Sequence, residues 1–447
     1  MTLEQFRQAA FDAALALGCE SAETYEVSGG DFAVTVLDGE IDTYNSSRSF
    51  GVGLRVIVGG KNGYAYTELL EDAETLVRRA MDNAAVIENT DVIPMQGAQS
   101  YPTVTPPAQP LCGMSEREKI GLALQMERLA KDVDPRFARA EYCGVNSSWT
   151  KTGIYNTLGL CAEESSENGS AMFYAIAEEN GTPQCSGTYR SGVAALDSAA
   201  IVKEAVEEAC ARFGASPVAP GDYPVIMRFD AAEALLGGFS GMFSADAAQK
   251  GLSLLAGKEN TRIGADCVTI IDDPLHPIDP SAFDAEGTPS VTKTVVENGV
   301  LKTLLHNLKT ALKAGVQSTA NASRTPGTPV SVSPTNFYIQ PGEKTLAQLL
   351  NDMGDGLLIT EISGLHAGLN PVSGSFSLLA NGFLVEGGKL VRPVEQITVA
   401  GSFLSLLGDV CDVGNDLSYE TYGCGGIGAP SLRIKSLKVA GAEQKKE

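Results

Sequence analysis

The first half of the chain carries two successive sets of helical and strand-like patterns. Apolar residues at helical spacing predict helices over 2–17, 71–88, 115–133 and 198–212. Thr2 and Ser115 each stand three residues before a Gln or Glu, the spacing of a capping box. Alternating runs bounded by turn residues predict strands over 31–37, 40–45, 51–58, 64–67, 137–146, 151–156, 169–178 and 184–189. Helix, strands and helix thus occur twice, which suggests a structural pseudo-repeat.

A proline-rich segment, SPVAPGDYP, separates this half from the rest at residues 216–224. Beyond it the pattern predicts a strand over 225–229, a helix over 230–247, and then short strands with brief helices over 308–313 and 344–353. The predicted fold class is α+β with two domains. The N-terminal domain, 1–216, combines helices with an antiparallel sheet, and the C-terminal domain, 225–447, is β-rich and partly barrelled.

A glycine-rich stretch over 364–401 organises the second half of the chain. It reads GLHAGLNPVSGSFSLLANGFLVEGGKLVRPVEQITVAG, and Asn381-Gly382 and Gly387-Gly388 are typical turn pairs between apolar runs. One interpretation is a series of ordinary hairpins. The other is a binding surface, because closely spaced glycines let backbone groups approach a ligand and expose a strand edge to a peptide.

Net charge and cysteine content exclude some classes of partner and indicate the cellular compartment. The net charge of −22 and the lack of a Lys/Arg cluster argue against nucleic acid as a direct partner. Nine cysteines without a CxxC pair favour a reduced, cytoplasmic setting. The N-terminal segment lacks a basic region ahead of its apolar pattern, and no apolar run approaches membrane-spanning length, so no membrane partner is expected.

Several segments resemble the TldD/PmbA family, whose members are sometimes called modulators of DNA gyrase. They are NPVSGSFSLLANGFLVEGGKLVRPVEQITVAG from residue 370, FDAEGTPSVTKTVVENGVLKTLLHN from residue 283, DVGND from residue 412 and APSLRIKSLKVAG from residue 429. The resemblance implies a metallopeptidase fold and activity. The sequence does not support the gyrase description, because the negative net charge of the chain argues against contact with DNA.

The resemblance also implies a division of labour between two kinds of subunit. Metal-bearing members carry an HExxxH motif on the helix that opens the C-terminal domain. Here that helix reads FDAAEALLGGFSGMFSADAA and contains no histidine, which places the chain with the PmbA/TldE-like branch. The branch implies a TldD-like partner that carries the zinc, unfolded or extended peptides as substrates, and no metal in this chain. A homodimer is expected when the partner is absent.

Candidate catalytic residues are few. The three histidines, His276, His306 and His366, lie on separate segments. His366, in the glycine-rich stretch, stands near Glu361 and could act in acid–base chemistry. His276 stands near Asp272, Asp273 and Asp279, which could suggest a metal, but loop aspartates next to prolines usually form turns. Cys424 lies near the position where the metal-bearing branch supplies a cysteine ligand. Its distance from the closing SLR segment is shorter than in that branch, so the role is not carried over. A stand-alone hydrolase using His366 or Cys424 is the alternative function.

The glycine-rich stretch also supplies the predicted substrate-binding surface. Its glycines would allow close backbone approach, and its polar side chains would contact the ligand on a concave surface facing the N-terminal domain or a partner. The predicted contact residues are Gly364, His366, Gly368, Asn370, Ser373, Gly374 and Phe376.

Overall fold

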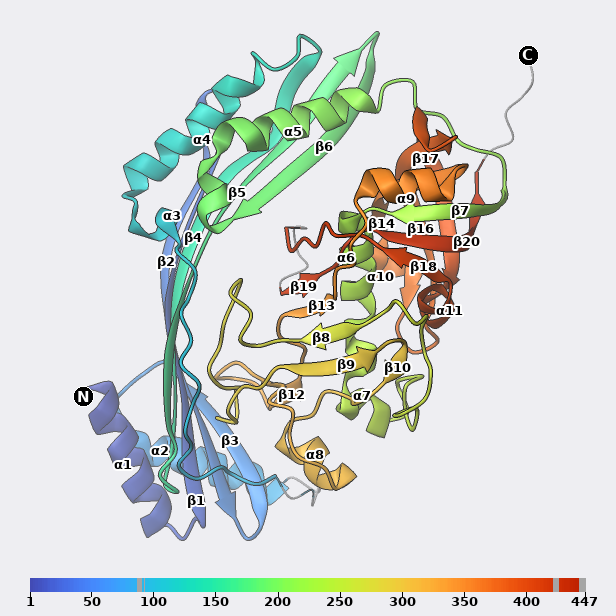
Figure 1. Cartoon of the computed structure of the whole chain (residues 1–447). Coiled ribbons are helices and arrows are strands. Elements are labelled where there is room, and N and C mark those ends of the chain that lie inside the picture. Colours follow the sequence, from blue (N-terminus) through green and yellow to red (C-terminus); the bar gives the residue numbers. More distant parts are fainter. Residues whose placement is uncertain (87–90, 92, 421–425, 442–447) are drawn as a thin grey trace.

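The computed structural model describes residues 1–86, 91, 93–420 and 426–441. A long, curled antiparallel sheet forms the N-terminal half (Figure 1). In the described residues its strand order is β3-β2-β1-β4-β5-β6. The strands are β1 (Ser21–Leu37), β2 (Glu40–Val58), β3 (Lys61–Thr67), β4 (Phe137–Asn156), β5 (Cys161–Glu179) and β6 (Thr182–Ser191).

Helices cover the two ends of this sheet. At one end α1 (Leu3–Ala16) and α2 (Ala73–Val86) bury a core with β1 and β2. At the other end α3 (Pro110–Gly113), α4 (Glu116–Ala130), η1 (Gly192–Leu196) and α5 (Ser198–Ala211) pack on β4 and β5. Thr2 and Ser115 form the capping boxes that the sequence predicts. The predicted order of helix, strands and helix therefore occurs at each end of the sheet.

Two predicted strand breaks are wrong. The predicted strands 40–45 and 51–58 are one strand, β2, and 137–146 and 151–156 are one strand, β4. The polar residues between the predicted strands 40–45 and 51–58 pair with β1 without interruption, from Asn45 opposite Ala33 to Ser49 opposite Gly29. Residues 40–49 are exposed at the edge of the sheet, because β3 pairs with β2 over residues 52–58, so polar residues continue the strand there without a buried face to set an alternating pattern.

The C-terminal half contains a closed barrel, as predicted. Within the described residues, five strands pair in the order β14-β7-β20-β17-β16, and β16 pairs again with β14. They are β7 (Gly221–Met227), β14 (Gly356–Ser363), β16 (Ser375–Glu386), β17 (Lys389–Ser402) and β20 (Leu432–Ala440). The short strands β15 (Leu369–Asn370) and β18 (Val410–Val413) extend this sheet.

The predicted helix over 230–247 is broken into three pieces. It forms α6 (Phe229–Phe239), the 3-10 turn η2 (Ser240–Phe243) and α7 (Ala245–Gln249). Gly237, Gly238 and Gly241 weaken the middle of the segment, and Ser244 has extended backbone angles and caps the last piece. The first piece packs into the core, where Phe239 stacks on Phe403 with 4.7 Å between ring centroids.

A smaller sheet lies beside α6 and the barrel (Figure 1). In the part of the chain that the structure describes, its strand order is β10-β9-β8-β13-β19. Its strands are β8 (Ile270–Asp272), β9 (Lys293–Glu297), β10 (Val300–Leu301), β13 (Phe337–Ile339) and β19 (Ile427–Gly428). The remaining elements of this half are α8 (Leu308–Ala314), β11 (Ala322–Ser323), β12 (Ser331–Val332), α9 (Leu346–Met353), α10 (Leu365–Gly368) and α11 (Phe403–Gly408).

One of the two predicted turns in the glycine-rich stretch is wrong. Gly387 and Gly388 do form the turn between β16 and β17, with φ of 55° and 76°. Gly382 instead lies inside β16, where a Cβ atom would stand 1.9 Å from the carbonyl oxygen of Leu358 on β14. Gly382 therefore allows two barrel strands to approach closely at a bulge, and it does not form a turn.

The two halves of the chain pack against each other. Arg324 of the C-terminal half donates to Glu23 of β1 at 2.8 Å, and both side chains are almost fully buried. A Cβ atom on Gly53 of β2 would stand 2.3 Å from the carbonyl oxygen of Pro326. The segment 216–224 follows α5 and supplies the first residues of β7, which begins at Gly221, and its role as a domain boundary stays a prediction. No helix in the described ranges has the length and apolar character needed to span a membrane.

Candidate functional site

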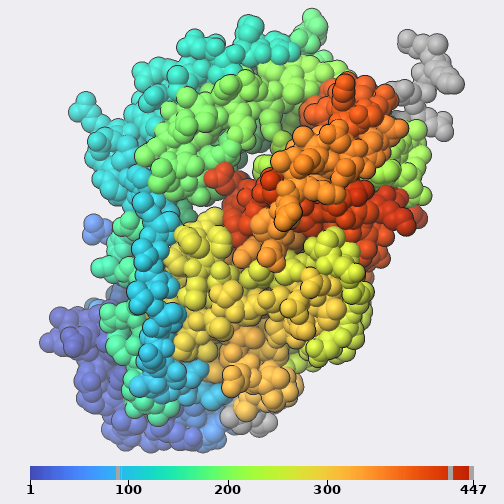
Figure 2. Space-filling view, in the orientation of Figure 1, coloured from blue at the N-terminus to red at the C-terminus, as the bar shows by residue number. Residues whose placement is uncertain are grey.

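A cleft of about 320 Å³ lies between the N-terminal sheet and the start of α6. Figure 2 shows the surface hollowed between the green α5–β6 region and the orange and red segments of the C-terminal half. Its walls come from β5, β6, α5, the start of α6, the end of β14 and the segment 418–420. Segments far apart in sequence thus meet at one concave surface, as binding sites often require.

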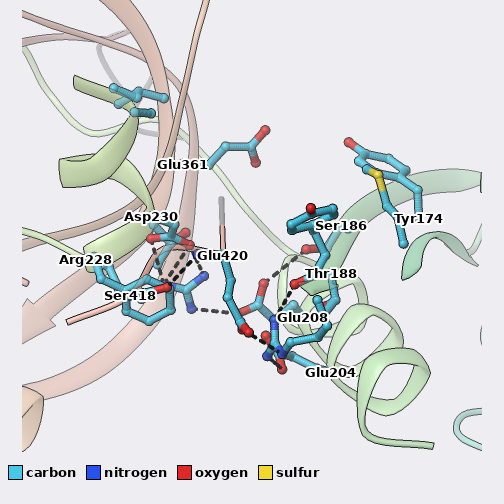
Figure 3. Close-up of a pocket in the computed structure, with 18 of the residues that line it drawn as sticks. Tyr174, Ser186, Thr188, Glu204, Glu208, Arg228, Asp230, Glu361, Ser418 and Glu420 are labelled. Carbon is cyan, nitrogen blue, oxygen red and sulfur yellow. Dashed lines mark hydrogen bonds and ion pairs between the residues drawn. The ribbon is translucent and has the colours of Figure 1, made fainter. Parts of the chain in front are cut away.

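Arg228 lines the cleft and is linked there to neighbouring carboxylates (Figure 3). It precedes α6, and its guanidinium group donates to both carboxylate oxygens of Asp230 through Nε, at 3.0 Å. It also donates through Nη1 to Glu208 of α5 at 2.6 Å. Ser186 of β6 donates its hydroxyl to the same Glu208 at 3.1 Å. One arginine therefore ties α6 to α5 and, through Glu208, to β6.

Two further arginines join the halves in the same way. Arg190 of β6 pairs with Glu204 of α5 and, across the cleft, with Glu420 at 2.9 Å. Arg212, which follows α5, pairs with Glu361 of β14 at 2.7 Å. Because Glu204 and Glu208 are four residues apart, they project from the same face of α5 toward the cleft.

The cleft holds more negative than positive side chains. Among the described residues that line it, five carry carboxylates and three carry guanidinium groups. Burial raises the pKa of Glu204 above its usual value although Arg190 opposes the shift. Burial likewise raises the pKa of Glu420, and repulsion from Glu204 adds to the effect. Burial would also raise the pKa of Glu208, but the charge and hydrogen bond of Arg228 outweigh it and lower that pKa.

The wall formed by β6 offers backbone as well as side-chain contacts. In the described sheet β6 pairs with β5 alone, and its residues from Ser186 to Arg190 line the cleft. In an edge strand, alternate residues direct their N–H and C=O groups away from the sheet, where an extended chain can pair with them. Thr188 of this strand is 3% exposed, and its hydroxyl has no hydrogen-bond partner among the described residues.

The predicted substrate-binding residues lie elsewhere, around α10 and the start of β16. The side chains of His366, Asn370 and Ser373 are exposed, Gly364 and Gly368 are half-buried, and Gly374 is buried. Phe376 is 4% exposed, and its ring meets that of Phe239 in the core at 6.3 Å between centroids. Asn370 accepts from the backbone N–H groups of residues 372 and 373 and so shapes a turn. Contact of this segment with a substrate stays a prediction.

Sequence reasoning missed the arginines and most carboxylates of the cleft. The sequence places Glu361 near His366, but the ion-pair partner of Glu361 in the structure is Arg212. Local signals were the Glu204–Glu208 spacing on a helix face and the nearness of Arg228 to Asp230, two residues apart. Two ion pairs, Arg190 with Glu420 and Arg212 with Glu361, instead join segments separated by more than a hundred residues, which no local pattern connects.

Three domains of one family match the chain. They are the PmbA/TldA metallopeptidase domain 1 over residues 22–84, the central domain over 109–213 and the C-terminal domain over 220–441. These matches cover most of the sequence, so the chain belongs to the PmbA/TldD metallopeptidase family. The family assignment made from the sequence is confirmed.

Individual relatives agree with this assignment. A Thermotoga maritima structure described as a modulator of a DNA gyrase is 35% identical, with a TM-score of 0.91, over 98% of this chain and 100% of that one. Metalloprotease PmbA of Escherichia coli O157:H7 is 29% identical over 72% of this chain and 70% of its own length. TldE from Thermococcus kodakarensis is 20% identical with a TM-score of 0.89, over 98% of this chain and 100% of that chain, and shows the shared fold.

The metal that the family name implies does not fit the residues described here. His276 lies against Tyr338 and Tyr419, His306 is buried beside Thr319, and His366 is exposed on α10. In α6, Asp230 is engaged by Arg228. No group of three or more His, Cys, Asp or Glu side chains in the described ranges could hold a metal ion. Cys424 lies outside the described residues.

Proposed function

We propose that this chain is the PmbA/TldE-like subunit of a heteromeric metallopeptidase that degrades or processes unfolded peptides. In this proposal a TldD-like partner with an HExxxH motif supplies the zinc and the hydrolytic step. This chain forms part of the chamber wall and admits extended substrates. The observation that carries the proposal is the first helix of the C-terminal domain, α6, which has no histidine in a chain that belongs to a metallopeptidase family.

Zinc chemistry explains why this helix matters. A catalytic zinc ion polarises the scissile carbonyl and generates hydroxide near neutral pH, for which it needs ligands in fixed geometry. Two histidines on one helix face are an economical way to supply two of them. The buried face of α6 instead carries alanine, leucine and phenylalanine, with Glu233 as its buried carboxylate. A helix of this composition supports packing of the wall rather than metal binding.

The cleft supports the proposal that this chain admits extended substrates. The edge of β6 can add an extended peptide by backbone pairing, and folded proteins lack a free extended segment of this kind. The cleft lies at the start of α6, so a peptide held there would run beside the helix that opens the C-terminal domain.

The test is to purify the chain alone and together with a TldD-like partner. Zinc content, molecular mass and cleavage of a quenched fluorescent unfolded peptide would be measured for each sample. We expect the isolated chain to form a homodimer without stoichiometric zinc and without cleavage, and the mixture to cleave in a chelator-sensitive manner. Chelator-sensitive cleavage by the isolated chain would contradict the proposal. Chelator-resistant cleavage that is lost in Cys424→Ala or His366→Ala would support a stand-alone hydrolase instead.

A further inference from the structure

We propose that the cleft between β6, α5 and α6 binds extended peptides that carry lysine or arginine side chains. This inference rests on the proposed function, because it assigns a substrate class to the chamber wall described above. It starts from the way the three arginines of the cleft are shared among its five carboxylates.

Two of these arginines each serve two carboxylates. Arg190 pairs with Glu204 and Glu420, and Arg228 pairs with Glu208 and Asp230. Each of these groups of three carries one negative charge more than its arginine can balance. Arg212 and Glu361 balance each other. A ligand that brings ammonium or guanidinium groups would complete this arrangement, whereas an acidic ligand would find every arginine already paired.

The carboxylates that carry the excess are reachable from the cleft. The side chains of Glu204 and Glu420 are 40% and 32% exposed, and both line the cavity. Burial is the main cause of their raised pKa values, and repulsion from neighbouring carboxylates adds to it although Arg190 opposes it. The charged groups that face them are Arg190, Glu208, Arg228 and Asp230.

The hydroxyl of Thr188 points to a ligand independently of charge. Its side chain is almost completely buried on the edge strand β6, it lines the same cavity, and no described group bonds its hydroxyl. Buried polar atoms are rarely left unsatisfied in folded proteins. A peptide paired with the β6 edge would bring backbone donors and acceptors within reach of this hydroxyl.

The experiment measures peptide binding to the full chain without any partner. Three fluorescein-labelled decapeptides of Gly and Ser, with blocked termini, carry two lysines, two glutamates or no charge. Fluorescence anisotropy at low and at moderate salt gives their affinities. We expect the lysine peptide to bind about tenfold more tightly than the neutral one, as two partly exposed ion pairs would provide, and the glutamate peptide to bind most weakly. The preference should fall with added salt.

Matched variants separate the cleft from the overall negative charge of the protein. Glu204→Gln with Glu420→Gln removes the excess charge while keeping acceptors for Arg190, and should abolish the preference. The control, Glu74→Gln with Glu207→Gln, changes the net charge equally at exposed helix positions outside the cleft and should retain it. Thr188→Val should weaken binding of all three peptides without lowering the thermal unfolding midpoint.

Three results would overturn the inference: equal affinity for the three peptides, no binding of any peptide, or the same loss of preference in both double variants. Unchanged binding by Thr188→Val would also count against it. The measurement is independent of cleavage. If the partner mixture cleaves peptides but this chain shows no charge preference, the inference fails and the proposed function stands. If basic peptides bind but no mixture cleaves, the proposed function fails.

Discussion

At the scale of single residues, Arg228 is the side chain on which the cleft depends most. It bridges Glu208 and Asp230 and is four-fifths buried. Removing one member of a buried ion-pair group leaves its partners charged without compensation, which costs more than the group contributes as a whole. Arg228 also lowers the pKa of Glu208, although burial alone would raise it. Both features predict a pH-dependent effect of its removal.

We expect Arg228→Met to lower the free energy of unfolding by about 2 kcal/mol at pH 7. This is less than the cost of breaking a fully buried ion pair, because these side chains are partly exposed. A lowered folded-state pKa stabilises the protein above the unfolded-state value, near 4.5, and this contribution is lost as pH falls through the folded-state value. The difference between variant and wild type should therefore shrink from pH 7 to pH 3, as measured by urea denaturation.

The matched control is Arg78→Met, which breaks an exposed pair with Glu74 on α2. Its effect should stay below about 0.5 kcal/mol at every pH. A loss in Arg228→Met no larger than that of the control would contradict the importance given to Arg228.

At the scale of elements, the barrel depends on glycines that let strands approach closely. Gly382→Ala would place a methyl group 1.9 Å from the Leu358 carbonyl oxygen, so β14 or β16 must move. We expect the variant to lose about 3 kcal/mol, the upper range for overpacking, and to shift the near-UV circular dichroism. Gly121→Ala, on α4 with open space around the added methyl, should instead gain about 0.5 to 1 kcal/mol. Equal thermal midpoints in the two variants would contradict this role of Gly382.

Local sequence predicts the elements well where a local rule decides them. The capping boxes at Thr2 and Ser115 and the turn at Gly387-Gly388 follow from residues within four positions of one another. Local sequence fails where partners are distant. Asn381-Gly382 has the composition of a turn, but pairing with β14 holds it in a strand. The cleft escapes prediction for the same reason, because partners such as Arg212 and Glu361 come from different halves of the chain.

At the scale of the whole molecule, a buried ionic cluster joins the N-terminal sheet to the C-terminal half. Glu23 and Arg55 come from the sheet, and Arg324, Asp284 and Glu286 come from the other half. Asp284 accepts backbone N–H groups from Glu286, Thr288 and Ala322, so it is well satisfied. Glu286 accepts from Leu308 through one oxygen, while its other oxygen has no partner among the described residues. This carboxylate is therefore the weak member of the cluster.

We expect Glu286→Gln to stabilise the protein at alkaline pH. Burial, with repulsion from Asp284, raises the pKa of Glu286 from 4.5 to about 7. Because the pKa of Glu286 is higher in the folded than in the unfolded protein, its stabilising contribution is fully present below the unfolded-state pKa. That contribution is lost as pH rises through the folded-state pKa. Wild type and variant should therefore unfold alike at pH 4 and diverge between pH 4.5 and 8, with the variant more stable at pH 8 by at most roughly 3 kcal/mol. Glu297→Gln, at an exposed position of β9, should show no such divergence. Urea denaturation across this pH range measures both, and an E286Q protein less stable than wild type at pH 8 would show that Glu286 supports the junction in its ionised form.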